Sequence, residues 1–242
     1  LIIWPEVAIP ARYGDVLDYL ATIRGWADEH NSNVMLGILR EDPNGGATQN
    51  VIVALGESPS FYAKRHLVPY GEYFPLPGFA RDWLRRMGLP FTDVGAGDPR
   101  QEALEVAGQK IATMICYEDV FGAEQLSYFP EATLIVNVSN DAWFGDSIAA
   151  PQHMQIARVR SAEVGRYTLR ATNTGITGII DPTGSIVAQA PQFEPRVMNG
   201  SVRSFVGTTP YTLWGNYLVV ISAFAVLLLQ LVTTKFTIRP GT

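Results

Sequence analysis

The single cysteine of this 242-residue chain, Cys116, has the side chain best suited to covalent chemistry. A cysteine thiol is a strong nucleophile once a neighbouring base or positive charge helps it to lose its proton. Cys116 follows residues 111–115, whose alternating β-branched residues predict a strand that enters a core. Acidic residues and then Phe121-Gly122 predict a turn after it. This position suits a nucleophile, although a lone cysteine is more often a buried structural residue.

Two charged residues that could complete this chemistry also follow predicted strands. Glu6 comes after the strand-like residues 1–4, and Lys64 follows a short strand in a loop rich in proline, glycine and aromatic residues. A carboxylate can take the proton of a thiol, and an ammonium group can stabilise the oxyanion that forms on an attacked carbonyl. Glu72 lies in the same loop as Lys64. Each alone has an ordinary interpretation, with Lys64 a solvated lysine and Glu72 an exposed loop carboxylate.

The elements that must position these residues alternate between strands and helices. Apolar residues at helical spacing predict helices, and alternating or continuous apolar runs predict strands. The expected helices are 15–30, 123–129 and 152–169, and the expected strands are 1–4, 34–39, 50–55, 104–106, 111–115, 132–138, 176–180 and 185–188. The turn at 41–46 makes a hairpin of the strands around it. This alternation predicts an α/β layered fold that ends near Val206.

Composition excludes several classes of function. The net charge of −5 and the lack of a basic run argue against nucleic-acid binding. His30, His66 and His153 are far apart, and no HExxH or CxxC motif occurs, so no metal site and no cofactor is expected. We interpret each histidine as a hydrogen-bonding scaffold residue. The arginines in or near the last predicted helix are interpreted as a solvated face: Arg158, Arg160, Arg166 and Arg170.

The C-terminal segment predicts a membrane helix. No charged residue occurs from Ser204 to Thr234, and residues 213–232 are predominantly apolar. A membrane span needs about 20 such residues, and a buried core helix is disfavoured because this segment has no polar face. Aromatic residues stand at one end of the segment and basic Lys235 and Arg239 at the other, which places the large domain on the outer face. At the other end, we expect that Leu1 lies just before, or inside, the first strand of a longer protein.

Three motifs together carry a resemblance to a known family. Trp4-Pro5-Glu6, the stretch Lys64-Arg65-His66-Leu67-Val68-Pro69-Tyr70-Gly71-Glu72, and Ile115-Cys116-Tyr117-Glu118 resemble the Glu-Lys-Cys triad of the nitrilase, or carbon–nitrogen hydrolase, superfamily. Ser139-Asn140-Asp141-Ala142-Trp143-Phe144-Gly145-Asp146-Ser147 and the terminal helix resemble its membrane-bound acyltransferases. The resemblance implies a four-layer α-β-β-α sandwich over residues 1–206. A transmembrane helix over 207–235 and a short cytoplasmic tail over 236–242 would follow.

The resemblance also implies roles for individual residues. Cys116 matches the nucleophile, Glu6 the general base and Lys64 the third member of the triad. Glu72 matches a supporting glutamate, and Tyr117 and Glu118 match positions beside the nucleophile that the family also needs. From the residue types, the backbone N–H after Cys116 is expected to join Lys64 in stabilising the oxyanion.

The activity that the resemblance implies is an acyl transfer in a membrane. An acyl chain would pass from a phospholipid donor to the cysteine as a thioester. It would then pass to the N-terminal amine of a diacylglyceryl-cysteine apolipoprotein, the acceptor. The expected protein is a monomer in the bacterial inner membrane, with further membrane helices ahead of this chain and the catalytic domain on the periplasmic side of the bilayer. A membrane-anchored amidase that uses water is the first alternative. A non-catalytic binding domain is the second, and the presence of Glu6, Lys64 and Cys116 together disfavours it.

Aromatic residues in two loops next to the catalytic motifs suggest a lid. Trp143 and Phe144 lie in one loop, and Phe74, Leu76 and Phe79 lie in or after the other. We expect them to form mobile apolar lids at the membrane face that admit acyl chains and exclude water. The alternative is that these aromatic residues simply pack inside the fold. A basic amphipathic stretch at 76–87 is equally consistent with a helix on an anionic membrane surface and with a solvated helix.

Overall fold

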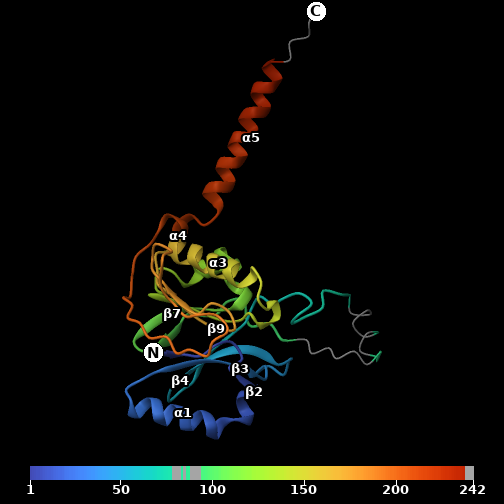
Figure 1. The fold of residues 1–242 in the computed structure, drawn as a ribbon. Helices are drawn as coiled ribbons and strands as arrows, with labels where there is room; N and C mark the ends of the chain where they lie inside the picture. The colour runs from blue at the N-terminus through green and yellow to red at the C-terminus, as the bar shows by residue number, and fades with distance from the viewer. Residues whose placement is uncertain (78–82, 84–85, 88–93, 238–242) are drawn as a thin grey trace, which may run out of the picture.

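Two β-sheets packed face to face, each covered by a helix on its outer side, make up the body of the protein (Figure 1). The computed structural model describes residues 1–77, 83, 86–87 and 94–237. Helix α1 (Leu17–Glu29) lies below the first sheet in Figure 1, and helix α3 (Ala149–Val164) lies above the second. This is the four-layer α-β-β-α arrangement that the family resemblance implied. Most of the stretch 76–87 lies outside the described residues.

The first sheet carries the ends that hold Glu6 and Lys64. Its strands are β1 (Ile2–Ile3), β2 (Ile9–Arg12), β3 (Val34–Arg40), β4 (Gln49–Leu55) and β5 (Ser60–Ala63). The order is β1-β3-β4-β5, and β2 also pairs with β3. Strands β3 and β4 form the predicted antiparallel hairpin, in register from Val34 opposite Leu55 to Arg40 opposite Gln49. Strand β2 was not expected from the sequence.

The second sheet carries Cys116. Its strands are β6 (Leu104–Val106), β7 (Gln109–Ile115), β8 (Leu134–Asn140), β9 (Thr168–Asn173), β10 (Gly178–Ile180) and β11 (Ile186–Gln189), in the order β11-β10-β9-β8-β7-β6. Strands β7, β8 and β9 are parallel. Their carboxyl ends therefore meet at one edge, where short 3₁₀ helices η2 (Cys116–Val120) and η4 (Ala142–Phe144) begin the loops. A third, η3 (Gly122–Tyr128), lies where a short helix was predicted at 123–129.

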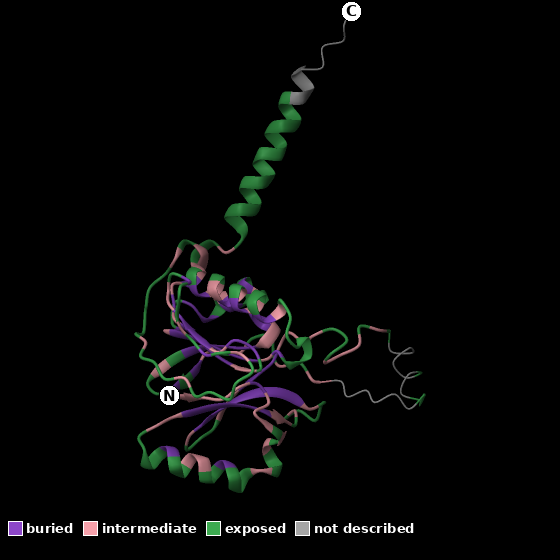
Figure 2. Cartoon of the chain, in the orientation of Figure 1, coloured by how far each residue is buried: buried purple, intermediate pink, exposed green. Residues whose placement is uncertain are grey.

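Alternation along the strands divides the apolar residues between three buried clusters (Figure 2). On β3, Met35 faces the second sheet, whereas Leu36 and Ile38 face α1. The cluster between the sheets also takes residues from β7 and β8, such as Ile111 and Ile135. Burying a side chain of this size contributes about 1.5–3 kcal/mol. The motifs that contain Glu6, Lys64 and Cys116 therefore lie at the edge of a two-sheet apolar core.

The helix predicted at 152–169 ends earlier than expected. Gly165 adopts φ 64° and terminates α3, which is a common way for a helix to end. Thr168–Asn173 then forms β9, a central strand that the sequence did not predict. The interpretation of the nearby arginines as a solvated face is wrong for Arg166 and Arg170, which are only 2% exposed. Arg166 donates to carbonyl groups that include those of Ala132 and Gly207, which explains how its charge is buried.

The C-terminal residues form helix α4 (Pro210–Trp214) and then helix α5 (Tyr217–Thr237). Helix α5 projects away from the body, and its side chains from Tyr217 to Thr233 are exposed (Figure 2). Within the described residues, no helix meets the combined length and apolarity of a membrane span. The transmembrane helix expected over 207–235 therefore stays a prediction.

Candidate active site

The structure brings the three predicted catalytic residues together where the two sheets meet. Glu6 lies in the turn after β1, Lys64 directly follows β5, and Cys116 directly follows β7. A close backbone contact positions Glu6. A Cβ atom added to Gly37 on β3 would lie 2.4 Å from the carbonyl oxygen of Pro5 and 2.7 Å from Cα of Glu6. Only glycine lets the strand approach this turn so closely.

Lys64 is buried between two carboxylates. Its Nζ lies 3.2 Å from Oε1 of Glu6 and donates to Oε1 of Glu72 at 2.8 Å. Its side chain is only 1% exposed. Burial opposes the charge of the ammonium group, but Glu6, Cys116 and Glu72 together raise its pKa well above the ordinary value. Lys64 therefore remains a fixed positive charge at neutral pH.

Three asparagines, none of which the sequence analysis singled out, fix the position of Glu6. Asn50 on β4 donates to Oε1 of Glu6 at 2.6 Å, and the backbone N–H of Asn140 donates to Oε2 at 2.7 Å. Asn173 donates to the backbone carbonyl of Glu6 at 2.9 Å. Asn50 belongs to the first sheet, and the other two stand at the ends of β8 and β9 in the second. The carboxylate is thus held from both sheets.

Cys116 has an unusual backbone conformation and a protonated thiol. Its φ is 52°, in a region that residues with a side chain rarely adopt and that recurs at functional sites. Burial, and after it the charge of Glu6, raises the pKa of the thiol to about 12, although Lys64 and the Ser139 hydroxyl act in the opposite direction. The free site therefore holds a thiol at neutral pH. Its proton must leave as the sulfur attacks, and Glu6 is the carboxylate that acts on this thiol most strongly.

Glu118 ties the ends of β5 and β7 to one another. Its Oε2 accepts from the backbone N–H of Ile115 and from the Tyr62 hydroxyl, both at 2.8 Å. Its Oε1 accepts from the backbone N–H of Arg65 at 2.7 Å and of His66 at 3.2 Å. Burial raises the pKa of Glu118, and these hydrogen bonds counter that effect. The residues that follow Lys64 and the residue that precedes Cys116 thus share one carboxylate.

The other predicted supporting residues also lie here. Glu72 fixes Lys64 and accepts from the backbone N–H of Val68 at 2.8 Å, so it shapes its own loop as well. Tyr117 follows Cys116 and packs edge-on against Phe121, with ring centroids 5.2 Å apart. Phe121 in turn stacks on His66 at 3.6 Å. The turn after Cys116 is therefore braced by aromatic contacts.

A buried group of charged residues lies behind the Cys116 turn and was missed by the sequence analysis. It consists of Asp119, Asp141, His153 and Arg170. Arg170 has 2% of its surface exposed and pairs with both aspartates at 3.3 Å. His153, which we interpreted only as a scaffold histidine, lies between the same two aspartates. The unexpected strand β9 is what brings Arg170 into this group.

The predicted lid residues differ in where they lie. Trp143 and Phe144 in η4 are 83% and 55% exposed, so the alternative that they pack inside the fold is wrong for this pair. Phe74 packs edge-on against Tyr70, with ring centroids 5.9 Å apart. Phe79 lies outside the described residues. The role of these residues as a lid stays a prediction.

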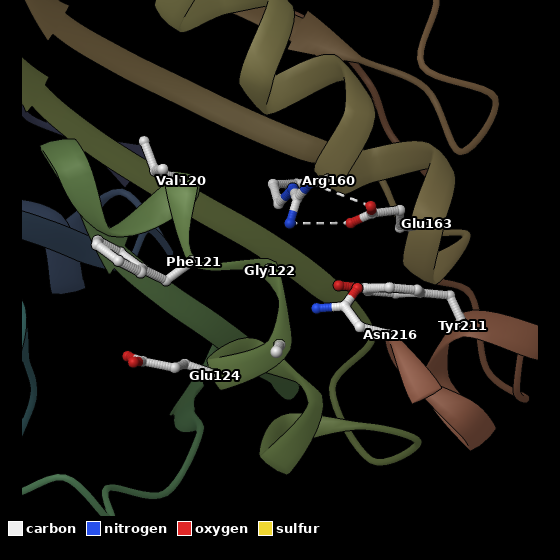
Figure 3. A pocket seen from close by; sticks show the side chains of 9 residues that line it. Val120, Phe121, Gly122, Glu124, Arg160, Glu163, Tyr211 and Asn216 are labelled. Atoms are coloured by element: carbon white, nitrogen blue, oxygen red, sulfur yellow. Dashed lines mark hydrogen bonds and ion pairs between the residues drawn. The ribbon is translucent and has the colours of Figure 1, made fainter. Parts of the chain in front are cut away.

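A pocket of about 360 Å³ opens beside the turn that follows Cys116 (Figure 3). Val120, Phe121 and Gly122 form one side, and Arg160 and Glu163 of α3 face each other on another, joined by two contacts of 3.0 Å (Figure 3). The pocket contains no member of the triad. Among the described residues, no group of three or more His, Cys, Asp or Glu side chains is arranged to hold a metal ion.

The fold and the arrangement of these residues define the class of protein. Residues 1–211 match the carbon-nitrogen hydrolase family, and the chain belongs to this family. Solved structures share the fold at low sequence identity. A carbon-nitrogen hydrolase from Helicobacter pylori G27 gives a TM-score of 0.57 at 15% identity over 76% of this chain and 66% of its own. An amidase of the nitrilase superfamily from Nesterenkonia AN1 gives 0.58 at 16% identity over 80% and 74%.

Relatives of higher identity carry a more particular name. Apolipoprotein N-acyltransferase from Methylococcus capsulatus is 48% identical over 218 residues, which are 90% of this chain and 43% of the relative. The protein of the same name from Chromobacterium violaceum is 43% identical over 96% of this chain and 45% of its own length. The chain thus spans less than half the length of these curated relatives.

Proposed function

We propose that this chain is the catalytic part of an apolipoprotein N-acyltransferase that carries the acyl group on Cys116. The observation that carries the proposal is the buried Lys64, paired with both Glu6 and Glu72 beside a protonated thiol. The names of the relatives support the choice of acyl donor and acceptor. A phospholipid is the proposed donor, and the amine of a diacylglyceryl-cysteine apolipoprotein is the proposed acceptor.

In the first half-reaction, Cys116 attacks the ester carbonyl of the phospholipid. Sulfur forms a bond to the carbonyl carbon, the thiol proton passes to Glu6, and the π electrons of the carbonyl move onto its oxygen. Lys64 and the backbone N–H of Tyr117 stabilise this oxyanion, an effect that typically contributes about 3 kcal/mol for one donor. The oxyanion then collapses, the ester C–O bond breaks, and the departing alkoxide takes the proton from Glu6. A lysophospholipid leaves, and a thioester remains on the enzyme.

In the second half-reaction, the α-amine of the acceptor attacks the thioester carbonyl. Glu6 accepts the proton that the amine loses, and the same donors stabilise the second oxyanion. Collapse breaks the carbon–sulfur bond, and the proton returns from Glu6 to sulfur. The product is an amide and Cys116 is a thiol again. The acyl group passes from an ester to a thioester and then to an amide without any change of oxidation state, so the proposal needs no cofactor.

The remaining residues have supporting roles in this proposal. Glu72 orients Lys64 through the 2.8 Å contact and keeps its ammonium group aimed at the site. Glu118 keeps the Lys64 and Cys116 strand ends at a fixed separation through its four hydrogen bonds. Tyr117 supplies its N–H and braces the turn against Phe121. A preorganised site of this kind loses rate steeply when a group moves by about 1 Å.

We also propose how the chain meets the membrane. Residues 1–206 form the catalytic domain, 207–235 the membrane helix and 236–242 a short cytoplasmic tail. Support comes from the exposed apolar side chains along α5, such as Ile221, Phe224 and Leu229. The domain would stand on the periplasmic side of the bacterial inner membrane as a monomer. The exposed Trp143 and Phe144, with Phe74 and Phe79, would admit acyl chains there.

The acceptor decides between this proposal and a water-using amidase. The full-length protein in phospholipid nanodiscs is supplied with a synthetic diacylglyceryl-cysteine peptide, and the products are analysed by mass spectrometry. We expect an N-acylated peptide and an equal amount of lysophospholipid. Free fatty acid without acylated peptide, together with ammonia released from small amides, would instead identify an amidase. Full transfer by a Cys116→Ala variant would exclude both.

A further inference from the structure

The buried charged group behind Cys116 has a balanced set of charges. His153 comes from α3, Asp119 from η2, Arg170 from β9, and Asp141 follows β8. His153 Nδ1 lies 2.9 Å from Oδ1 of Asp141, and its Nε2 lies 3.1 Å from Oδ1 of Asp119. Arg170 pairs with the other oxygen of each aspartate. The two cations therefore pair with the two anions. Such pairing offsets the desolvation free energy of burying charged groups.

The contacts of His153 require a proton on both ring nitrogens. The Nε2 atom faces two acceptors, Oδ1 of Asp119 and the backbone carbonyl of Cys116 at 3.2 Å. The Nδ1 atom faces a carboxylate oxygen that already accepts from the Ser139 hydroxyl at 2.8 Å. Each nitrogen must therefore donate, so the ring is an imidazolium. The carbonyl of Cys116 thus accepts from a cation, and Asn137 Nδ2 lies 3.5 Å from the same oxygen.

This carbonyl belongs to the same peptide group as the N–H of Tyr117. A trans peptide is planar, so the N–H points away from the carbonyl. Tyr117 is the second residue of η2, where an N–H has no acceptor within the helix, and the described residues provide no backbone acceptor outside it. A cationic donor on the carbonyl side fixes the plane of the peptide and withdraws electron density from it. Hydrogen bonds in such a chain polarise one another, which makes the N–H a stronger donor.

We infer that His153 is a positioning residue for acyl transfer: from behind the Cys116 turn it orients and polarises the Cys116–Tyr117 peptide, so that the Tyr117 N–H is aimed at the oxyanion. This inference rests on the proposed function, because an oxyanion forms only when Cys116 attacks a carbonyl. His153 itself touches neither the thiol nor the substrate in this account. It acts through one peptide group, so its loss should slow only those reactions of Cys116 that form an oxyanion.

Two reactions of Cys116 separate this role from a merely structural one. Acylation by p-nitrophenyl butyrate passes through an oxyanion, whereas alkylation by iodoacetamide displaces iodide from a saturated carbon and forms none. Both are measured as single-turnover rates on the full-length protein. The variants are His153→Leu, which removes the donor, and His153→Gln, which keeps an N–H at a similar reach. His30→Gln, on the exposed end of α1 far from this group, is the matched control.

We expect His153→Leu to slow acylation by about 10- to 100-fold, since loss of one oxyanion donor costs about 100-fold or more. His153→Gln should recover part of that loss, and alkylation should change by less than about threefold in both. Equal losses in both reactions would reduce His153 to a structural role and overturn the inference, as would unchanged acylation. If His153→Leu does not fold, His153→Gln decides by the same comparison. A wild-type protein that is alkylated but never acylated would instead overturn the proposed function, and this inference with it.

Discussion

Glu118 accepts a hydrogen bond from the backbone N–H of Arg65 at 2.7 Å, across the boundary between the two sheets. The same carboxylate accepts from Ile115, the residue before Cys116. Lys64 and Cys116 are 52 positions apart in the sequence. Glu118 nevertheless binds the residue directly after Lys64 and the residue directly before Cys116. This link therefore helps to fix the separation of the proposed nucleophile and the proposed oxyanion cation.

Replacement of Glu118 by Gln should damage both stability and acyl transfer. The amide would turn an N–H₂ group toward donors that now meet an oxygen, and hydrogen bonds to a charged group contribute about 1.5–3 kcal/mol each. We expect the free energy of unfolding to fall by about 2 kcal/mol or more, and thioester formation to fall by about 100-fold. Chemical denaturation and single-turnover acylation measure the two effects. Tyr62→Phe, which removes only one of the four donors, is the control and should lose less of both.

Replacement of Glu6 by Gln should separate the reactivity of the thiol from acyl transfer. Glu6 raises the pKa of Cys116 and Lys64 lowers it, so the variant should have a lower thiol pKa than the wild type. The pH midpoint of iodoacetamide alkylation should therefore move down. Transfer to an amine should nevertheless fall by about 100-fold or more, since no group remains to carry the proton. An upward shift of the alkylation midpoint, or undiminished transfer, would contradict the role proposed for Glu6.

The stability of the protein should depend on pH through His153. Burial opposes the charge of His153, but its hydrogen bonds to Asp119 and Asp141 raise its pKa from 6.5 to about 9. Because the folded-state pKa lies above the unfolded one, the stabilisation is fully present below about pH 6.5 and is lost as the pH rises through about 9. The difference corresponds to ~3 kcal/mol. Urea denaturation between pH 6 and 10 should show this decline in the wild type, and a smaller one in His153→Gln. Parallel curves for the two proteins would contradict the assignment.

Replacement of Trp143 and Phe144 by Ser should leave the fold intact and impair the use of membrane lipid. Their exposure leaves little packing to lose, so the free energy of unfolding should change by no more than about 0.5 kcal/mol. Acylation of Cys116 from phospholipid vesicles should slow, whereas acylation by a water-soluble ester should not. If both donors react at the wild-type rate, these residues are not a lid.

The layered fold was predictable because it depends on local patterns, whereas the triad was recognised through the family resemblance of three motifs at strand ends. The alternating β-branched residues at 111–115 predict a strand, and the turn at 41–46 predicts the hairpin of β3 and β4. Strand β9 was not predictable in the same way. Its polar residues Arg170 and Asn173 are typical of a helix surface or a loop. Their hydrogen-bond partners come from distant parts of the chain and are evident only in the tertiary structure. The boundary at Gly165 depends on a backbone conformation that the periodicity did not indicate.

The residues that contact the triad could not be predicted from the sequence for a related reason. Asn50 reaches the site from β4, Asn140 and Asp141 reach it from the end of β8, and no sequence spacing connects them to Glu6 or Cys116. One signal was available. Asn137 and Asn140 interrupt the end of an apolar strand parallel to the one before Cys116, and polar residues at such a strand end suggest a site. The sequence therefore indicated the candidate reacting groups, while the contacts that orient them required the structure.

The mass of the protein after exposure to its donor tests the central claim most directly. The full-length protein is incubated in nanodiscs of defined phospholipid without acceptor, and its intact mass and Cys116 peptide are measured before and after addition of a diacylglyceryl-cysteine peptide. We predict a mass increase of one acyl chain on Cys116 that hydroxylamine removes and that the acceptor peptide discharges as an amide. The Cys116→Ala variant should gain no mass. An N-acylated peptide formed while Cys116 never carries an acyl group would contradict this account.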